Sequence, residues 1–390
     1  MTSDKRLLWT ISFHHACNDG TLMVLVALIP IFVEDMSISY YDIGLLGFGL
    51  LISVVVQFMV GRVADRVVSK YLLEVGAGLM GTSFVLMLLV SDFPTLFAVV
   101  IVMRIGAAFY HPVGTSWITR EFAGPYLDTA IGIQSGVGNF GVILALGTSG
   151  FMAEAWGWKV PCIVWAGLNF AAVIAGTLLL KQTTLSSPAG ARLARRSAWK
   201  TLDKMWLLIV PIVGGGALYQ ITSYFGPINL TESGGWTAGN ADLAFAVWIC
   251  VGTLTSYYFG SMSTRFGKET LLQYGYLLGV VGASVLAFYS DWPVVIPTLV
   301  LYGAFLFMTY PALFSILSET TDPAERGTAF GILFGFQLGG GATMVYLSGI
   351  VAETLDSPSI PFAIVAGLSL ASLVTVLVYG RRRGKRSGIR

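Results

Sequence analysis

Long apolar segments recur along the whole chain and alternate with short polar connections. Each segment has about 20 or more residues, the length of a helix that crosses the hydrocarbon core of a bilayer. The segments are continuously apolar rather than alternating, so the pattern favours helices over the strands of a barrel. We predict twelve spans, at residues 7–33, 42–64, 71–91, 94–118, 126–153, 159–181, 205–230, 239–261, 270–290, 293–318, 326–352 and 360–380.

Composition agrees with this pattern. Of the 390 residues, 55% are hydrophobic and 11% are charged, against about 25% charged residues in soluble proteins. The sequence therefore predicts an all-α integral membrane protein. No cleavable signal peptide is expected, because the first apolar run is long and contains histidines and an aspartate. The three cysteines, Cys17, Cys162 and Cys250, lie in apolar segments at spacings that fit neither disulfides nor a metal site.

The basic residues predict the orientation of the chain. With twelve spans, 21 of the 23 Lys and Arg residues fall on one face, and Lys159 and Arg104 are the exceptions. The positive-inside rule then places both termini in the cytoplasm of a multi-pass protein of the cell (inner) membrane. The opposite loops are short and carry acidic residues, among them Glu154 and Asp242. They leave no room for a soluble enzyme domain, and we expect no nucleic-acid partner.

One polar connection, 182–204, is long and basic, and we predict that it lies as a linker along the anionic cytoplasmic leaflet. It separates an N-terminal six-helix bundle, 1–181, from a C-terminal one, 205–380, and a basic tail occupies 381–390. The halves repeat at a shift of 199 residues, since Asp92-Phe93-Pro94 recurs as Asp291-Trp292-Pro293, and His111-Pro112 corresponds to Tyr310-Pro311. Two pseudo-symmetric bundles are therefore expected.

The first span contains the polar run His14-His15-Ala16-Cys17-Asn18-Asp19. A carboxyl near mid-bilayer costs roughly 2.5–3.5 kcal/mol on insertion scales, so Asp19 should face a cavity or a partner. Residues four apart share one face of a helix, which groups His15 with Asp19 and His14 with Asn18.

The fourth span holds Arg104 and, two helical turns later, His111. From their depths we expect two layers, Asp19 facing Arg104 and His15 facing His111. Imidazoles titrate near neutral pH, so we predict that His15, Asp19, Arg104 and His111 couple transport to protons. A buried structural ion pair with hydrogen-bonded histidines is the alternative. No metal site is predicted, because adjacent His14 and His15 point about 100° apart on a helix.

Other polar groups within spans are candidates for solute binding. They are His14, Asn18, Arg104, Gln134 and Asn139 in the first half and Tyr219, Gln220, Tyr224, Tyr310 and Gln337 in the second half. Tyr310 ranks first among the tyrosines, because it is the repeat partner of His111. The alternative for the tyrosines is an interfacial aromatic belt. Gly214-Gly215-Gly216 predicts a flexible or broken helix of the kind seen in transporters.

The connection from Gly61 to Lys70 has a glycine, a carboxylate four residues later and basic residues. It resembles the cytoplasmic signature loop of the major facilitator superfamily. The resemblance implies the major facilitator fold and a conformational latch made by Gly61, Asp65 and Arg66. In the second half Arg265 remains, but Thr264 replaces the acid. A positive-inside loop with an incidental acid is the alternative.

Three further motifs give a narrower resemblance. The run from His15 to Asp19, the run from Phe109 to Pro112, and Gly138-Asn139-Phe140-Gly141 resemble helices one, four and five of fosmidomycin-resistance-type transporters. That resemblance implies a drug/proton antiporter. Val113 stands where that family usually has a glutamate, and Arg104 replaces a small residue. These departures remove a negative charge and add a positive one, which favours an anionic solute.

The function expected from the sequence is proton-coupled secondary transport by alternating access, most simply export of a small amphipathic or anionic solute in exchange for protons. We expect a monomer in a lipid bilayer, with no cofactor and no enzymatic activity. A proton symporter or facilitator for uptake of a small organic anion is the alternative. Two other classes of protein are remote alternatives. A membrane sensor would need an output domain, and an intramembrane enzyme would have to use Cys17 beside His14.

Overall fold

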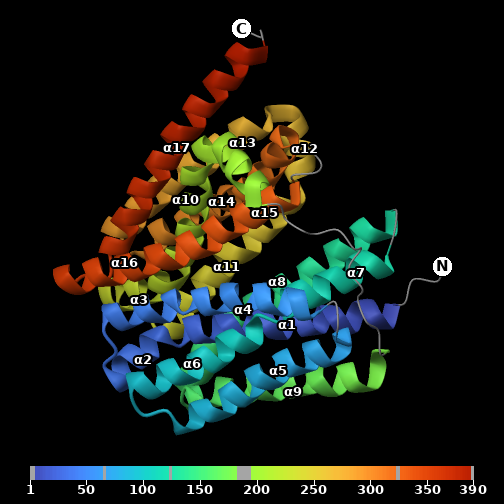
Figure 1. The fold of residues 1–390 in the computed structure, drawn as a ribbon. Coiled ribbons are helices and arrows are strands. Elements are labelled where there is room, and N and C mark those ends of the chain that lie inside the picture. The colour runs from blue at the N-terminus through green and yellow to red at the C-terminus, as the bar shows by residue number, and fades with distance from the viewer. Residues whose placement is uncertain (1–4, 65–66, 123–124, 182–194, 322–325, 388–390) are drawn as a thin grey trace. The chain divides into compact units, whose positions relative to one another are not determined.

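The structure is a computed structural model that describes residues 5–64, 67–122, 125–181, 195–321 and 326–387 (Figure 1). The described residues are helical throughout, with short connections. The helices are α1 Lys5–Ala27, α2 Ile29–Met36, α3 Tyr40–Phe48, α4 Leu50–Val63, α5 Ser69–Leu86, η1 Met87–Leu89, α6 Phe93–Ala107, η2 His111–Thr115, α7 Ser116–Glu121, α8 Pro125–Trp156, α9 Lys159–Leu179, α10 Arg195–Gly234, α11 Ala238–Tyr257, α12 Phe259–Phe266, α13 Lys268–Phe288, α14 Trp292–Thr320, α15 Arg326–Phe334, η3 Gly335–Gly339, α16 Gly340–Leu355 and α17 Ile360–Ser387.

Eleven candidate membrane spans are found among the described residues, or twelve when the bent pair α1 and α2 counts as one span. The predicted fold class, all-α with twelve spans, is confirmed. Each span lies within a few residues of its predicted place, because an apolar run long enough to cross a bilayer must be helical to satisfy its own backbone.

Several spans are interrupted, and the sequence explains two of the interruptions. The axis bends by 43° between α1 and α2, just before Pro30, whose ring disfavours the preceding helical turn and which has no N–H to donate. Pro112 lies in η2, a single π-helical turn between α6 and α7. π-turns inside α-helices are often found at functional sites.

The start of α6 is capped by its preceding aspartate. The carboxylate of Asp92 accepts a hydrogen bond from the backbone N–H of Thr95 at 2.9 Å, and the two residues form a capping box. This hydrogen bond lowers the pKa of Asp92, because it stabilises the ionised carboxylate. The repeat partner, Asp291, precedes α14 without a side-chain cap.

The chain divides into two compact units. Unit 1 comprises residues 1–38, 49–190 and 237–246, and unit 2 comprises 39–48, 191–236 and 247–390. In unit 1, α1 packs along α8 and α5 along α9; in unit 2, α13 packs against α14 and α17. Each unit thus includes one short segment from the other half of the sequence. The predicted boundaries at 181, 204 and 380 stay a prediction.

The structure of α10 bears on two predictions, the linker at 182–204 and the helix break at Gly214-Gly215-Gly216. The helix begins at Arg195, within the predicted linker, whose residues 182–194 lie outside the described part of the chain. The helix also runs unbroken through Gly214-Gly215-Gly216, so the prediction of a broken helix there is wrong. Gly214 faces the side chain of Ser372, and a Cβ on Gly216 would overlap the carbonyl of Gln337. These two glycines therefore permit close packing rather than bending.

The apolar core of unit 1 includes a cluster beside the polar run of α1. Ile11 of α1 packs with Val113 of η2 and with Trp117 and Ile118 of α7, and all four are at most 1% exposed. Burying one such side chain contributes about 1.5–3 kcal/mol. The cluster therefore fixes η2 against α1 and positions the histidine that begins η2.

Candidate functional site

Asp19 of α1 lies at the centre of a polar cluster in unit 1. Its Oδ2 is 3.0 Å from Nε2 of His15, and its Oδ1 is 3.5 Å from Nε2 of His111. The side-chain amide of Asn18 donates a hydrogen bond to Oδ1 at 2.8 Å. We call His15, Asp19 and His111 the Asp19 cluster. It joins α1 to η2 through one carboxyl group.

The ring of His15 is fixed on both sides. Its Nδ1–H donates to the backbone carbonyl of Gln134 at 2.9 Å. Its plane stacks on Tyr110, with ring centroids 4.5 Å apart and 15° between planes. The side-chain amide of Gln134 donates to the Tyr110 hydroxyl at 2.8 Å. Gly138 contributes the remaining space, because a Cβ there would overlap the imidazole.

This arrangement determines where one hydrogen lies. A carbonyl oxygen only accepts, so Nδ1 of His15 must carry a hydrogen. The 3.0 Å contact between Nε2 of His15 and Oδ2 of Asp19 then requires a second hydrogen, on either the imidazole or the carboxyl. The geometry of this contact is therefore that of a pair that can share one proton.

His111 is the open side of the Asp19 cluster. Its side chain is 46% exposed, against 10% for His15 and 22% for Asp19. It lies 5.4 Å from the His15 ring, in an edge-to-face arrangement. Because His111 begins the π-turn η2, a change in that turn would move its imidazole away from Asp19. His111 is thus the member of the Asp19 cluster that solvent reaches most easily, and its part in proton coupling stays a prediction.

Of the two expected layers, the rings of His15 and His111 do face each other, although both imidazoles also contact Asp19. The expected pairing of Asp19 with Arg104 stays a prediction. Arg104 of α6 is buried, and its carbonyl accepts a hydrogen bond from the Ser53 hydroxyl at 2.7 Å. Sequence reasoning missed Tyr110, which stacks on His15. Its position directly before His111 was the available signal.

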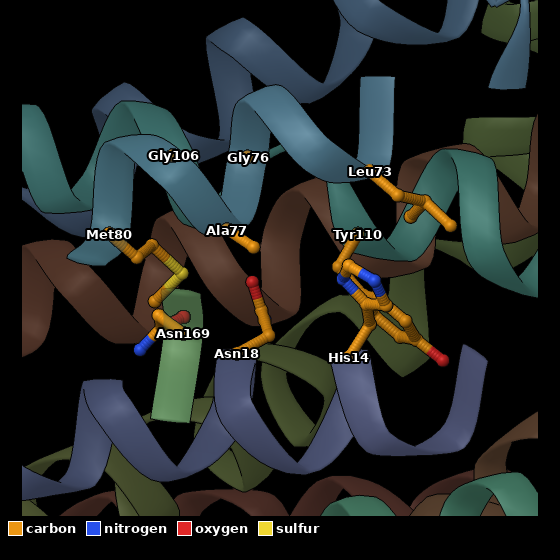
Figure 2. A pocket seen from close by; sticks show the side chains of 9 residues that line it. All are labelled: His14, Asn18, Leu73, Gly76, Ala77, Met80, Gly106, Tyr110 and Asn169. Atoms are coloured by element: carbon orange, nitrogen blue, oxygen red, sulfur yellow. The ribbon is translucent and has the colours of Figure 1, made fainter. Parts of the chain in front are cut away.

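The other face of α1 lines a separate, small pocket (Figure 2). His14 and Asn18 point from α1 into it. The pocket is closed by residues of α5, α6 and α9 and by Tyr110, which directly precedes η2: Leu73, Gly76, Ala77, Met80, Gly106, Tyr110 and Asn169. A ring nitrogen of His14 is hydrogen-bonded to the backbone of Ala172. The pocket measures about 10 Å³, which is room for one water molecule at most. Solute binding by His14 and Asn18 stays a prediction that this conformation does not support.

Among the remaining first-half candidates, Gln134 is buried and hydrogen-bonded as above, whereas Asn139 is partly exposed. Asn139 makes no hydrogen bond to another described residue. Its role in solute binding stays a prediction.

The second-half candidates lie in unit 2 around α10. Tyr219 stacks on Trp248 at 5.7 Å, and Phe307 contacts both Tyr219 and Tyr310 edge-to-face. The Tyr310 hydroxyl donates to the carbonyl of Gly215 at 3.3 Å. Trp248 and Phe307 were missed, since an apolar residue in an apolar span carries no signal of its own.

Three further candidates in unit 2 are buried. Gln220 donates to the carbonyl of Leu338 at 3.3 Å, and Gln337 lies in the π-turn η3. Tyr224 is 4% exposed. Their contacts with a solute stay a prediction.

The latch predicted from the signature loop stays a prediction. Asp65 and Arg66 lie outside the described residues. No described atom lies within 4 Å of a Cβ placed on Gly61, so this glycine packs against no neighbouring helix in this conformation. Arg265 is exposed and lies over the ring of Phe266, 5.1 Å from its centroid.

The Asp19 cluster has a donor set that metal ions also use. One ligand atom from each of its three residues lies within 4.8 Å of the others. The sequence argument against a metal site considered His14, but the structure brings His111 to the pair instead. The same geometry serves a shared proton without any metal. The predicted absence of a metal site stays a prediction.

Comparison with known proteins identifies the family of this chain. The sequence model of the Major Facilitator Superfamily matches residues 11–290 and 217–390. The chain belongs to the Major Facilitator Superfamily. It is therefore a multi-pass membrane transporter of small molecules rather than an enzyme, as the sequence predicted.

Distant relatives within this superfamily include two resistance proteins. The fosmidomycin resistance protein of Escherichia coli (strain K12) is 22% identical over 388 residues, covering 96% of this chain and 93% of that protein. The quinolone resistance protein NorA of Staphylococcus aureus (strain COL) is 23% identical over 371 residues, covering 93% of each. The resemblance to the fosmidomycin-resistance type is thus confirmed at the level of distant relationship.

Solved structures share the major facilitator fold. The nucleoside transporter NupG superposes with a TM-score of 0.81 at 16% identity, covering 97% of this chain and 99% of that chain. A bacterial homologue of the human lysosomal transporter Spinster, in an inward-facing and unoccupied conformation, gives a TM-score of 0.77 at 15% identity, covering 97% and 95%. At these identities the likeness concerns the fold alone.

Proposed function

We propose that this major facilitator protein exports a small amphipathic or anionic solute in exchange for protons, and that the Asp19 cluster carries the protons. One observation supports the proposal above the others. Oδ2 of Asp19 lies 3.0 Å from Nε2 of His15, a distance at which the two groups can share a proton, and the half-exposed His111 reaches the same carboxylate. Ionisable groups within membrane spans generally mark proton or ion pathways.

The cycle follows from the connection between α1 and η2. With its shared proton in place, the Asp19 cluster ties the imidazole of His111 to α1. When a proton leaves the cluster by way of His111 to water, the imidazole that remains is neutral and bonds the Asp19 carboxylate more weakly, so η2 can move. A solute couples to this change only if it binds one state more tightly than the other. Arg104, buried on α6, contributes the positive charge that an anionic solute would meet.

Exchange rather than uptake is favoured by the distant relatives, whose names are those of resistance proteins. Their names also put fosmidomycin and quinolones first among test solutes. A thermal-unfolding screen of solutes across pH would extend the choice, because a compound that binds the native state raises its apparent stability.

The test uses purified protein in proteoliposomes with an imposed pH gradient. Asp19→Asn removes the titrating carboxyl and keeps its size. We expect it to abolish solute flux driven by the pH gradient while exchange of labelled for unlabelled solute at equal pH continues. Asp291→Asn is the matched control, because Asp291 is an exposed carboxyl with no side-chain cap. Gradient-driven flux at the unmodified rate in Asp19→Asn would refute the proposal.

A further inference from the structure

Outside the Asp19 cluster, unit 1 contains a carboxyl group that is fully buried. Asp242 of α11 is 0% exposed, and neither of its carboxylate oxygens has a hydrogen-bond partner. Asp242 was counted among the loop acids, although the predicted span began at 239, and the structure places it within α11, which begins at Ala238. A buried carboxylate without donors is strongly unfavourable, so the neutral acid is the form that this packing accommodates.

The N–H groups that begin α11 have other acceptors. The carboxylate of Glu154, near the end of α8, accepts a hydrogen bond from the backbone N–H of Gly239 at 2.8 Å. The hydroxyl of Thr237 accepts from the backbone N–H of Asn240 at 3.3 Å. Asp242 therefore gains nothing from the helix N-terminus, where an anion would otherwise be stabilised.

Close packing surrounds this carboxyl. Gly239, Asp242 and Ala246 recur at three- and four-residue spacing and so lie on one face of α11. That face lies against α8, where a Cβ on Gly150 would be 2.5 Å from Oδ2 of Asp242 and 2.8 Å from Cα of Gly239. Ala246 lies 3.9 Å from the Cβ position of Gly147. The carboxyl thus occupies the middle of a tight contact between small residues.

One charged group acts on Asp242 from the helix that packs against it. Glu154 of α8 interacts electrostatically with Asp242, and no described Lys, Arg or His forms an ion pair with it. Glu154 is exposed and lines an open pocket along α8 with Gly147 and Phe151. A proton leaving Asp242 therefore has an exposed carboxylate beside it and solvent beyond.

We propose that Asp242 is a second proton-binding site, whose neutral acid form keeps segment 237–246 packed on α8. When the O–H bond of Asp242 breaks, the proton passes by way of Glu154 to water. The negative charge that remains can be hydrated only if the segment separates from α8. For its role in the cycle this inference rests on the proposed proton-coupled transport, but the following measurement requires no transport.

The experiment places spin labels on α8 and α11 of the full-length chain in lipid nanodiscs. Cysteines replace Leu144 and Asn240, two exposed positions of unit 1, after the three native cysteines are changed to alanine. Distances between the labels are measured from about pH 5 to about pH 9, a range in which one titrating proton changes the ratio of two populations up to tenfold per pH unit. We expect the population at longer distance to grow as pH rises.

Variants make the test specific. Asp242→Asn, which resembles the neutral acid, should keep the short distance at every pH. Glu154→Gln should move the transition to lower pH, because one of two like charges is removed. Asp291→Asn should behave like the unmodified chain. If Asp242→Asn does not fold, the shift of the transition pH in Glu154→Gln tests the proposal by itself.

Two results would overturn the proposal. One is a distance that does not change with pH in the unmodified chain. The other is a pH-dependent distance that persists in Asp242→Asn or keeps its transition pH in Glu154→Gln. Failure of the Asp19→Asn flux test would leave these distances unaffected, so the two proposals can fail separately.

Discussion

Replacing Gly138 by alanine should displace His15 and uncouple transport from protons. A Cβ at this position would lie 2.7 Å from Cγ of the imidazole, whereas carbon atoms in contact prefer about 3.5–4.0 Å. The ring must therefore move by roughly 1 Å. The contact between His15 and Asp19, now 3.0 Å, would lengthen to roughly 4 Å, beyond hydrogen-bonding distance.

The size of the effect follows from the contact that is lost. A hydrogen bond to a charged group contributes about 1.5–3 kcal/mol, and about 1.4 kcal/mol corresponds to a factor of ten. Flux driven by a pH gradient should therefore fall roughly tenfold to a hundredfold. Proteoliposomes with an internal pH indicator measure it, with solute exchange at equal pH as the reference.

Gly136 supplies the matched control on the same helix. No described atom lies within 4 Å of a Cβ placed there, and alanine is the better helix former by up to about 1 kcal/mol. Gly136→Ala should keep full coupling and equal or greater thermal stability. The reasoning is refuted if Gly138→Ala couples as well as the unmodified chain, or if both alanine variants lose coupling equally.

Three further predictions concern stability and ions. The hydrogen bonds that Thr95 donates to Asp92 lower the pKa of this capping carboxylate. The contribution of the cap to stability is therefore present above the ordinary carboxyl pKa and is lost as pH falls through the native-state pKa. Asp92→Ala should thus reduce the thermal midpoint at neutral pH but not in strong acid; an equal reduction at both would contradict this. Gly216→Ala, which overlaps the Gln337 carbonyl, should lower the free energy of unfolding in detergent by about 1–3 kcal/mol, whereas Gly367→Ala, in open space, should be neutral. A chelator should leave proton-driven flux unchanged, and inhibition reversed by added Zn²⁺ would favour a metal in the Asp19 cluster.

The spans could be predicted because their physical constraint is local. An apolar run of this length has one stable conformation in a bilayer, so its ends follow from where polar residues begin. Asp92-Phe93-Pro94 gave an accurate start for α6, since aspartate caps a helix and proline suits its first turn. The start of α11 was predicted within one residue, at 239 against Ala238. Asp242 was nevertheless counted among the loop acids, because a buried acid resembles a loop residue in sequence.

The residues of the Asp19 cluster could be predicted from the sequence, but their geometry could not. Helical spacing correctly grouped His15 with Asp19, which are paired in the structure. It could not show that His111 reaches the same carboxylate, because that depends on the π-turn at Pro112 and on how α1 packs along α8. Nor could it show which face of α1 meets the small pocket around His14. Such features depend on contacts between segments distant in sequence.

The central claim is that the Asp19 cluster holds a proton that is exchanged for solute. Its most direct test is proton release by purified protein in weakly buffered detergent, followed with a pH indicator when a solute that raises the thermal midpoint is added. We predict proton release from the unmodified chain and from Asp291→Asn, and none from Asp19→Asn. Equal release from Asp19→Asn, with solute affinity retained, would contradict the account.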